Sequence, residues 1–440
     1  MGRATPPGAC TPRAGLVTLC LVLAAVCLAP PCALGEEPPA EGDPSRSIVE
    51  QTDITGSLRG SYWSSSRSLD KKENLGVAAL WLRGRSQLAP PVALVADGWL
   101  MNDTLFQAHA TKALLREGYL DLQLGSLDVR VGKQIIAWGR ADRINPTDNL
   151  TSRDFTLLVP EDSDQRTGTT GIKAAYQLAG FSLTGVWLPT FEPHVVPIET
   201  PRDPFILLPR QLPNEPVSQY AVKLEQTGSK VDWSLSFFDG FDLYPDLQIV
   251  GMTLTTVNVA QTYHRIQVIG ADVATVWGPY GLRAEAAYTF TEHSRSNQVK
   301  SPFFLLVLGA DRTFLVNLNI NLQFVLRMIS DYQNPINVPD PARRAVAIEQ
   351  ATLNSQLDRV HESITLRVSK KWFGETLETE VASILGLARL DYAVRPKMKY
   401  AITDRWRLTV GGDIFRGPDP SFFGRIRDTS TAYVELRWDY

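Results

Sequence analysis

His361 and Ser363 are the residues of this sequence whose types and spacing come closest to a catalytic pair. They are separated by one residue, so on an extended strand both side chains face the same side. An imidazole beside a hydroxyl is the arrangement in which histidine acts as the base for a serine nucleophile. The other side of this stretch carries Ile364, Leu366 and Val368, so the pair is expected to face water.

The other residues capable of catalysis or metal binding are scattered. The histidines are His109, His194, His264, His293 and His361, and no two stand four apart as a helical metal pair would. The chain lacks the Gly-x-Ser-x-Gly sequence of hydrolases with a nucleophile elbow, and also lacks P-loop and dinucleotide-binding sequences. We therefore expect a protein that is not an enzyme and has no metal and no cofactor. His361 and Ser363 are then polar residues of a strand.

The N-terminus has the pattern of a secretory signal peptide. Arg3 and Arg13 precede an apolar run from Leu16 to Leu28, and Ala33-Leu34-Gly35 follows with the small residues of a cleavage site. The run is too short to cross a membrane as a helix. We predict a cleaved signal peptide at 1–35, a leader at 36–52 and the main domain at 53–440. All four cysteines precede the cleavage site, which leaves none for a disulfide.

The composition excludes two classes of protein. The formal net charge is −3, so the basic excess typical of nucleic-acid-binding proteins is missing. After the signal peptide, no segment approaches the roughly 18 consecutive apolar residues of a membrane-spanning helix. The longest apolar run, Phe303 to Ala310, is far shorter.

The apolar residues instead alternate with polar ones. In the stretch Leu315 to Met328, one face carries Val316, Leu318, Ile320, Leu322, Phe324, Leu326 and Met328. The other face carries Asn317, Asn319, Asn321, Gln323 and Arg327. Strands in water-soluble sheets usually end after about five or six residues, whereas this run is twice as long. The final stretch, Thr431 to Tyr440, alternates in the same way and ends on an aromatic residue. Such strands are typical of a membrane barrel with lipid outside and water inside.

Short turns and long loops alternate between these strands. Turn residues occur at Gly125-Ser126, Ala179-Gly180, Thr227 to Lys230, Gly278 to Gly281, Gly309 to Arg312, Trp372 to Glu375 and Thr403-Asp404. Long segments occur at Arg140 to Arg166, Pro189 to Pro216, Asp239 to Gln261, Ser330 to Arg359 and Arg416 to Asp428. We predict an all-β fold, a transmembrane antiparallel up-and-down barrel of about 18 strands with 16 as the alternative. Its short turns and the leader lie on the periplasmic side, its long loops lie outside, and one or more loops fold into the lumen.

One stretch, Glu117 to Asp148, carries a recurring motif. Two strands joined at Gly125-Ser126 lead into a glycine-rich strand and a proline loop, whose motif residues are Gly132, Lys133, Gln134, Trp138, Gly139, Asn145, Pro146 and Asp148. This G-K-Q-x-x-x-W-G strand with its N-P-x-D loop resembles a porin-like family of Gram-negative outer-membrane barrels of unassigned function. It is distantly similar to alginate-export-type porins. The resemblance implies a barrel in the outer membrane and leaves the transported solute open.

The motif residues also invite a physical interpretation. We expect Gly132 and Gly139 to relieve crowding where a bulky neighbour or a folded-in loop approaches the wall. Trp138 is expected at a strand end, where membrane barrels place a girdle of aromatic residues. A hairpin and loop anchor is favoured over direct contact with a solute.

The alternation also assigns charged residues to the interior. The predicted pore-lining residues are Arg59, Asn317, Asn319, Asn321, Gln323, Arg327, Arg367, Glu378, Glu380, Arg395, Lys397, Lys399, Arg407, Asp413, Glu435 and Arg437. Closure of the barrel is expected to bring Arg59 and Arg437 together. Opposed cations and carboxylates create a field across the lumen that orients solutes. The alternative is that they pair with each other and brace a hydrated wall.

The predicted function is a porin-like channel in the outer membrane for passive passage of small hydrophilic or amphipathic solutes. One alternative is a conduit for hydrophobic compounds coupled to an inner-membrane exporter, suggested by the apolar segments Phe205 to Pro209 and Val195 to Ile198. Another is a plugged barrel that serves as a scaffold or adhesin. Expected partners are outer-membrane lipid and lipopolysaccharide, the barrel-assembly machinery at the C-terminal strand, and an unidentified small solute. A homo-oligomer is compatible with the pattern, and nucleic acid is not expected.

Overall fold

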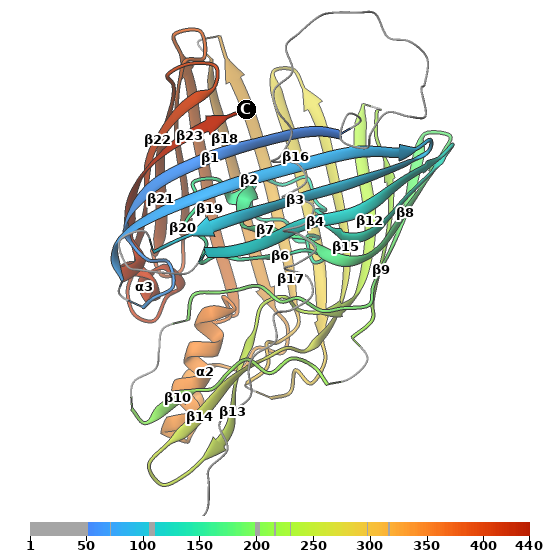
Figure 1. Ribbon diagram of the computed structural model, residues 1–440. Helices are drawn as coiled ribbons and strands as arrows, with labels where there is room; N and C mark the ends of the chain where they lie inside the picture. Colours follow the sequence, from blue (N-terminus) through green and yellow to red (C-terminus); the bar gives the residue numbers. More distant parts are fainter. Residues whose placement is uncertain are drawn as a thin grey trace, which may run out of the picture.

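The chain forms a closed barrel of 18 antiparallel strands (Figure 1). The computed structural model describes residues 52–440 except 71, 105–110, 199–202, 215–216, 229, 297 and 316. Each wall strand pairs with its sequence neighbours in the wall, and the ring closes where β1 pairs with β23. The predicted barrel and its count of 18 strands are confirmed. The predicted signal peptide and nearly all of the leader lie outside the described residues.

The first half of the wall has nine strands. They are β1 (Thr52–Ser65), β2 (Glu73–Ala89), β3 (Val92–Asn102), β4 (Thr111–Leu124), β5 (Leu127–Gln134), β8 (Thr169–Leu178), β9 (Phe181–Leu188), β11 (Gln219–Gln226) and β12 (Val231–Phe241). The second half is β15 (Arg265–Trp277), β16 (Tyr280–Thr291), β17 (Phe303–Phe314), β18 (Leu318–Ile329), β19 (Val360–Trp372), β20 (Leu377–Gly386), β21 (Tyr392–Ala401), β22 (Trp406–Arg416) and β23 (Thr431–Asp439).

Strand β18 shows how the alternation becomes two faces. Leu322 is 51% exposed on the outside of the barrel, whereas its neighbour Gln323 is 1% exposed on the inside. Two boundaries predicted from the sequence are wrong. Asn317 lies in the turn before β18, because it takes a left-handed backbone conformation (φ 55°) that asparagine tolerates and a strand does not. The predicted turn at Gly309 to Arg312 lies inside β17, which continues to Phe314.

The closing pair of strands places like charges side by side. In the register of β1 with β23, Arg59 is opposite Arg437, as expected from the sequence. Ser61 is opposite Glu435 in the same pairing, so a carboxylate follows on the same face.

The two ends of the barrel differ. Tight connections such as residues 125–126, 179–180 and 278–279 join strands at one end. The other end carries the connections 135–168, 189–218, 242–264 and 330–359. This confirms that short turns and long loops alternate. Among the described helices, none is both long and apolar enough to cross a membrane.

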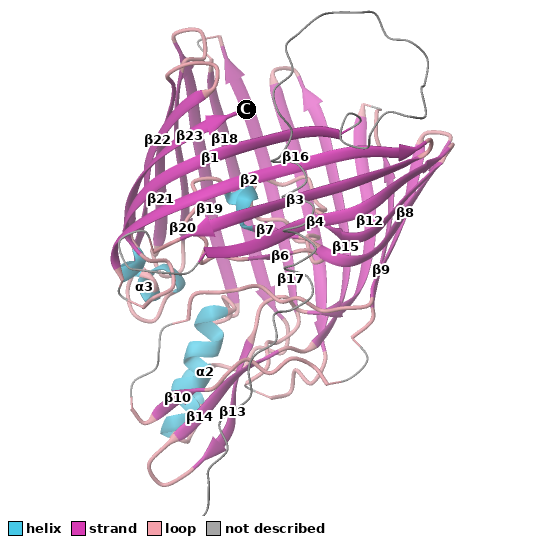
Figure 2. Cartoon of the chain, in the orientation of Figure 1, coloured by secondary structure: helices cyan, strands magenta, loops and turns pink. Residues whose placement is uncertain are grey.

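The connection between β5 and β8, residues 135–168, is the luminal segment. It contains β6 (Ser152–Arg153), η2 (Asp162–Gln165) and β7 (Arg166–Thr167) and is seen within the barrel (Figure 2). Its side chains bond to β1, β16, β19 and β21, strands on different sides of the ring. Only a segment inside the barrel reaches all of them. The sequence predicted that a loop enters the lumen without identifying which one.

Two of the long loops, together with a short strand from a third, build an outer lobe beyond the rim. It consists of β10 (Phe205–Leu207), β13 (Asp246–Met252), β14 (Val257–Thr262) and α2 (Pro341–Leu353), shown below the barrel in Figure 1. Leu247, Val257 and Val259 pack against Val346 of the helix. Asp340 caps the helix by accepting from the N–H of Arg343. The sequence predicts long loops for these residues, and nothing in its alternation predicts the lobe.

The crowding expected at Gly132 is present and predicts a folding defect. Gly132 has φ +133°, and a Cβ there would lie 2.4 Å from the carbonyl oxygen of Gly118. We expect Gly132→Ala to cost about 1–3 kcal/mol of stability, since both the conformation and the contact disfavour a side chain. The measurement is the thermal midpoint of the refolded barrel. Gly185→Ala is the matched control, because its Cβ would meet nothing within 4 Å. Equal midpoints would contradict the prediction.

Candidate functional site

A buried carboxylate holds the luminal segment against the wall. Glu285 of β16 is 1% exposed and points into the bend of the segment. Its Oε1 accepts from the N–H (2.9 Å) and the hydroxyl (2.8 Å) of Thr147. Its Oε2 accepts from the N–H groups of Arg140 (3.0 Å) and Ala141 (3.1 Å). These donors offset the cost of burying a charge and fix the bend in place.

Gly139 allows this approach. It has φ +95°, and a Cβ on it would lie 2.6 Å from Oε1 of Glu285. The expected crowding at this glycine is therefore caused by the folded-in segment. Asn145 of the proline loop completes the bend by donating to the carbonyl of Ala141 (2.8 Å).

The far end of the luminal segment is an acidic tip, Glu161 to Asp164, that meets cations of the wall. Its ion pairs are Asp164–Arg59 (2.8 Å), Asp164–Arg116 (3.9 Å), Asp162–Arg395 (2.5 Å), Asp162–Arg143 (3.4 Å), Glu161–Lys399 (2.9 Å) and Glu161–Lys397 (3.2 Å). Four of these six cations were predicted to face the lumen. Arg116 of β4 and Arg143 of the luminal segment itself were not in that prediction.

These pairs change the acidity of the tip. Burial raises the pKa of Asp162, but Arg395 and Arg143 outweigh it and lower the pKa from 3.8 to about 2. Burial likewise raises the pKa of Glu161, and Lys397 and Lys399 bring it below its usual value. Both carboxylates therefore stay ionised at neutral pH and keep the tip on the wall.

A second cluster lies where the segment crosses β19, β20 and β21. Glu380 accepts from Arg143 at 3.3 Å and lies 3.5 Å from Lys397. Arg367 pairs with Asp142 at 2.9 Å. With its amide turned so that both groups are satisfied, Gln323 donates to the carbonyl (3.1 Å) and accepts from the N–H (2.8 Å) of Asp142.

The structure thus brings together most of the residues predicted to line the pore. Those on or beside the luminal segment are Arg59, Asn321, Gln323, Arg367, Glu380, Arg395, Lys397, Lys399 and Asp413. Glu435 is buried on the inner face of β23. Glu378 lies on β20 opposite Lys399.

Other members of the predicted set lie away from this region. Asn319 bonds Thr313 beside the turn before β18. Arg407 and Arg437 gather around Asp439 at the end of the barrel with short turns. Arg327 donates to the carbonyl of Asn354, the residue that follows α2.

The motif residues serve the segment in different ways. Lys133 pairs with Glu192 at 2.7 Å, and the buried Gln134 donates to the carbonyl of Gly171 at 3.3 Å. Asp148 binds Arg166 at 2.5 Å. The prediction for Trp138 is wrong: it is 7% exposed and packs in a core with Ile136, Leu188 and Phe238. The chain leaves the wall after Gln134 and turns inward, which carries the indole away from the outer surface.

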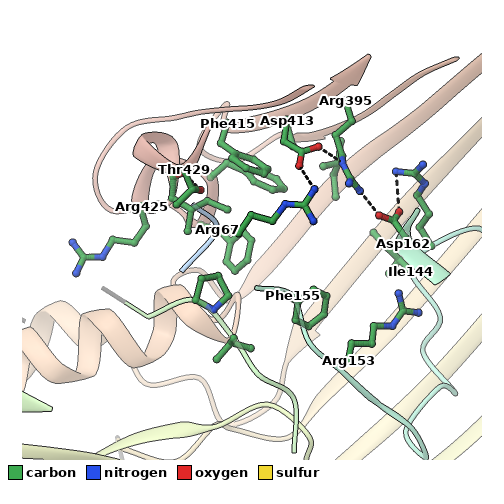
Figure 3. Close-up of a pocket in the computed structure, with 18 of the residues that line it drawn as sticks. Arg67, Ile144, Arg153, Phe155, Asp162, Arg395, Asp413, Phe415, Arg425 and Thr429 are labelled. Carbon is green, nitrogen blue, oxygen red and sulfur yellow. Dashed lines mark hydrogen bonds and ion pairs between the residues drawn. The ribbon is translucent and has the colours of Figure 1, made fainter. Parts of the chain in front are cut away.

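An inner cavity of about 390 Å³ lies between the luminal segment, strands β18 to β22 and the outer lobe (Figure 3). Its apolar lining includes Ile144, Phe155, Pro197, Phe415 and Phe422. It also has six arginines and four carboxylates, which are Arg67, Arg143, Arg153, Arg367, Arg395, Arg425, Asp142, Asp162, Glu349 and Asp413. The cavity can therefore hold a solute that has both an apolar and a charged part.

An alternating row of charges borders this cavity. Arg67 pairs with Asp413 at 2.8 Å, and Asp413 pairs with Arg395 at 2.6 Å. Arg395 also pairs with Asp162, so cations and anions alternate along the row (Figure 3). The guanidinium of Arg67 also lies 4.7 Å from the ring centre of Trp63.

Sequence reasoning missed Glu285, Arg116 and Arg67. The signal for Glu285 was available, because Arg283 and Glu285 alternate with apolar residues in the run Leu282 to Tyr288. The predicted set of pore-lining residues contains Arg59 and residues from Asn317 onward, and so leaves this strand out. Arg67 lies in a loop, where alternation gives no signal.

The histidine–serine pair forms as the spacing predicts. Ser363 Oγ lies 3.1 Å from His361 Nε2, and Ser363 is 2% exposed. A hydroxyl this deeply buried is not open to a substrate. Among the described residues, no group of three or more histidine, cysteine, aspartate or glutamate side chains is placed to hold a metal ion.

Comparison with known proteins gives the fold. No family model matches the sequence, and no curated protein matches it. The crystal structure of Pseudomonas aeruginosa OccK5 (OpdH) has a TM-score of 0.54 at 12% identity, covering 90% of this chain and 99% of that one. Acinetobacter baumannii OccAB2 has a TM-score of 0.54 at 8% identity, with coverages of 90% and 99%. Pseudomonas aeruginosa OccD3 (OpdP) has a TM-score of 0.51 at 13% identity, with coverages of 89% and 91%.

These neighbours are outer-membrane porins. The chain has the fold of an 18-stranded porin. The comparisons do not test the G-K-Q-x-x-x-W-G motif or the similarity to alginate-export-type porins. Both remain predictions from the sequence.

Glu285 predicts where the luminal segment will loosen. In Glu285→Gln one acceptor oxygen becomes an NH₂ group that faces N–H donors. We expect the free energy of opening the segment to fall by about 1–3 kcal/mol, so that trypsin cuts it about 5- to 150-fold faster. The cleavage sites follow Arg140, Arg143 and Arg153. Glu378→Gln is the control, since its carboxylate lies on the wall near the short turns. Equal cleavage in the two variants would refute the anchor.

Asp162 predicts an effect of acid. Its pKa is lowered in the folded protein, from 3.8 to about 2, so its contribution is complete above pH 3.8 and is lost as the pH falls through 2. The contribution is about 2 kcal/mol at most. We expect pepsin to cut the segment near Phe155 much faster in Asp162→Asn than in the parent at pH 4, with the ratio approaching one at pH 2. A ratio that does not change with pH would count against the ion pair.

Proposed function

We propose that the chain is a channel of the bacterial outer membrane for passive passage of small hydrophilic or amphipathic solutes. The observation that carries this proposal is the luminal segment, which is held across the barrel and borders a cavity open to mixed polar and apolar contacts. Inward-folded loops are a usual way for a wide barrel to narrow its lumen. The solute would enter from the end with long loops and pass beside the segment.

The outer surface supports a place in the membrane. Outward-facing residues such as Leu58, Val222, Leu235, Ile269 and Leu322 are each about half exposed. In water an apolar surface of this extent would promote aggregation, whereas lipid would cover it. The partners that follow are outer-membrane lipid and lipopolysaccharide, and the barrel-assembly machinery at β23. A homo-oligomer is compatible with this arrangement.

The inner cavity supports amphipathic solutes over strictly polar ones. Phe155, Phe415 and Phe422 offer apolar surface beside the arginines. Because six arginines face four carboxylates in the lining, the excess of positive charge is small. We expect a weak preference for anions, since most of these arginines are already paired.

A second candidate is a conduit for hydrophobic compounds working with an inner-membrane exporter. It is favoured by Val196, Pro197 and Ile198, which line the inner cavity at its outer side. Phe205 and Leu207, from the other apolar segment, line a neighbouring cavity together with Ile198. Both apolar segments therefore contribute to the surface between the two cavities, which supports this second candidate.

Planar-bilayer recording on the refolded chain 36–440 under a salt gradient tests the channel. We expect discrete conductance steps and a small reversal potential of the sign that indicates anion preference. Solute uptake into liposomes would then measure permeation directly. A correctly folded barrel that stays silent in both experiments would exclude passive passage and favour the exporter conduit or the plugged scaffold.

A further inference from the structure

A second cavity lies outside the inner one. This outer cavity, of about 510 Å³, is bounded by β10, β14 and α2 of the outer lobe and by the loop that follows β22. It shares Ile198, Leu247, Glu349 and Arg425 with the inner cavity. The two cavities are therefore adjacent, and the shared residues form the boundary between them.

An ion pair between described residues crosses this boundary. Arg425 of α3 (Phe422–Arg425) donates from Nε to Oε1 of Glu349 on α2, at 2.9 Å. The two side chains are 41% and 32% exposed. In Figure 3 the side chain of Arg425 extends away from the other labelled residues of the inner cavity.

The helices that carry the pair are themselves firmly held. Gln350, next to Glu349, accepts from the N–H of Leu247 (2.6 Å) and donates to the fully buried Asp246. On the other side Phe423 stacks on Phe415 with ring centres 6.0 Å apart, and its N–H donates to Asp391. Two fixed helices thus present two long, half-exposed side chains to each other, and those side chains can part without moving the backbone.

The charge of the lining changes sign at this boundary. The outer cavity has two arginines and four carboxylates, which are Arg425, Arg427, Asp203, Glu349, Asp419 and Asp428. The inner cavity has an excess of arginines. A charged solute therefore meets a different field on each side of the pair, which is where a barrier controls its passage most effectively.

We propose that the Arg425–Glu349 pair is a latch between the two cavities. A solute collects in the outer cavity and passes to the inner one when the latch is open. This inference rests on the proposed channel function and adds the route and its barrier. A charged group of the solute can replace one partner of the latch, so that the other partner faces an opposite charge during passage.

Single-channel recording on the full chain 36–440 tests the latch. We expect Arg425→Gln and Glu349→Gln each to raise the fraction of time in the highest conductance level by up to about fivefold, the range that an exposed ion pair allows. The double exchange R425E/E349R restores the parent level, since the pair can form again. Arg427→Gln is the matched control, because Arg427 lines the outer cavity and not the inner one.

A reversible cross-link gives the opposite test. The chain 36–440 has no cysteine, so R425C/E349C can be bridged specifically by a bifunctional thiosulfonate reagent. We expect the bridge to lower conductance and a reducing agent to restore it. The single variants R425C and E349C, treated alike, control for modification alone.

The outcomes separate the latch from the channel. If the parent conducts and the neutralised and bridged variants have the same conductance levels as the parent, the latch is overturned and the channel stands. An effect of Arg427→Gln equal to that of Arg425→Gln would also overturn it, because charge in the outer cavity would then suffice. A folded parent that is silent together with all variants would overturn the channel and the latch with it.

Discussion

The position of the luminal segment depends on one buried carboxylate. Glu285 satisfies three backbone N–H groups and one hydroxyl of a bend that would otherwise present unpaired donors to the wall. A carboxylate at 1% exposure is costly unless its oxygens are bonded, and here both are. The same bend places Asp142 and Arg143 next to Arg367 and Glu380. The position of the inner cavity follows from this anchor.

The interior charges mainly bind each other. Each acid of the tip meets cations of the wall, and Asp413 bridges Arg67 and Arg395. This favours the interpretation that the charges brace the wall and the segment. The other interpretation, that the charges orient a solute, is compatible with it, because a paired arginine at the edge of a cavity still has N–H donors available. A solute can thus be oriented by a row of charges whose positions are fixed by pairing.

The sequence predicted the wall well and the interior poorly, for a physical reason. Strand alternation reports on two environments that differ strongly, so β18 and the closure of Arg59 against Arg437 followed from it. Trp138 was misplaced because an indole is suited both to a membrane girdle and to a buried core. The helix α2 was missed because alternation with a period of two reports only on strands. Which loop enters the lumen depends on pairing between distant residues such as Glu285 and Thr147, and no local pattern records that.

The strength of the contacts decreases along the proposed route, from the middle of the barrel to its outer rim. The wall is held by continuous strand pairing, and the bend by a carboxylate removed from solvent. The latch is an ion pair whose partners are 41% and 32% exposed, and solvent screens such pairs strongly. The free energy needed to break contacts and let a solute pass is therefore lowest at the outer boundary and highest at the bend. A channel arranged in this way keeps the charges beside the inner cavity fixed, so the field that a solute meets there stays constant while access changes.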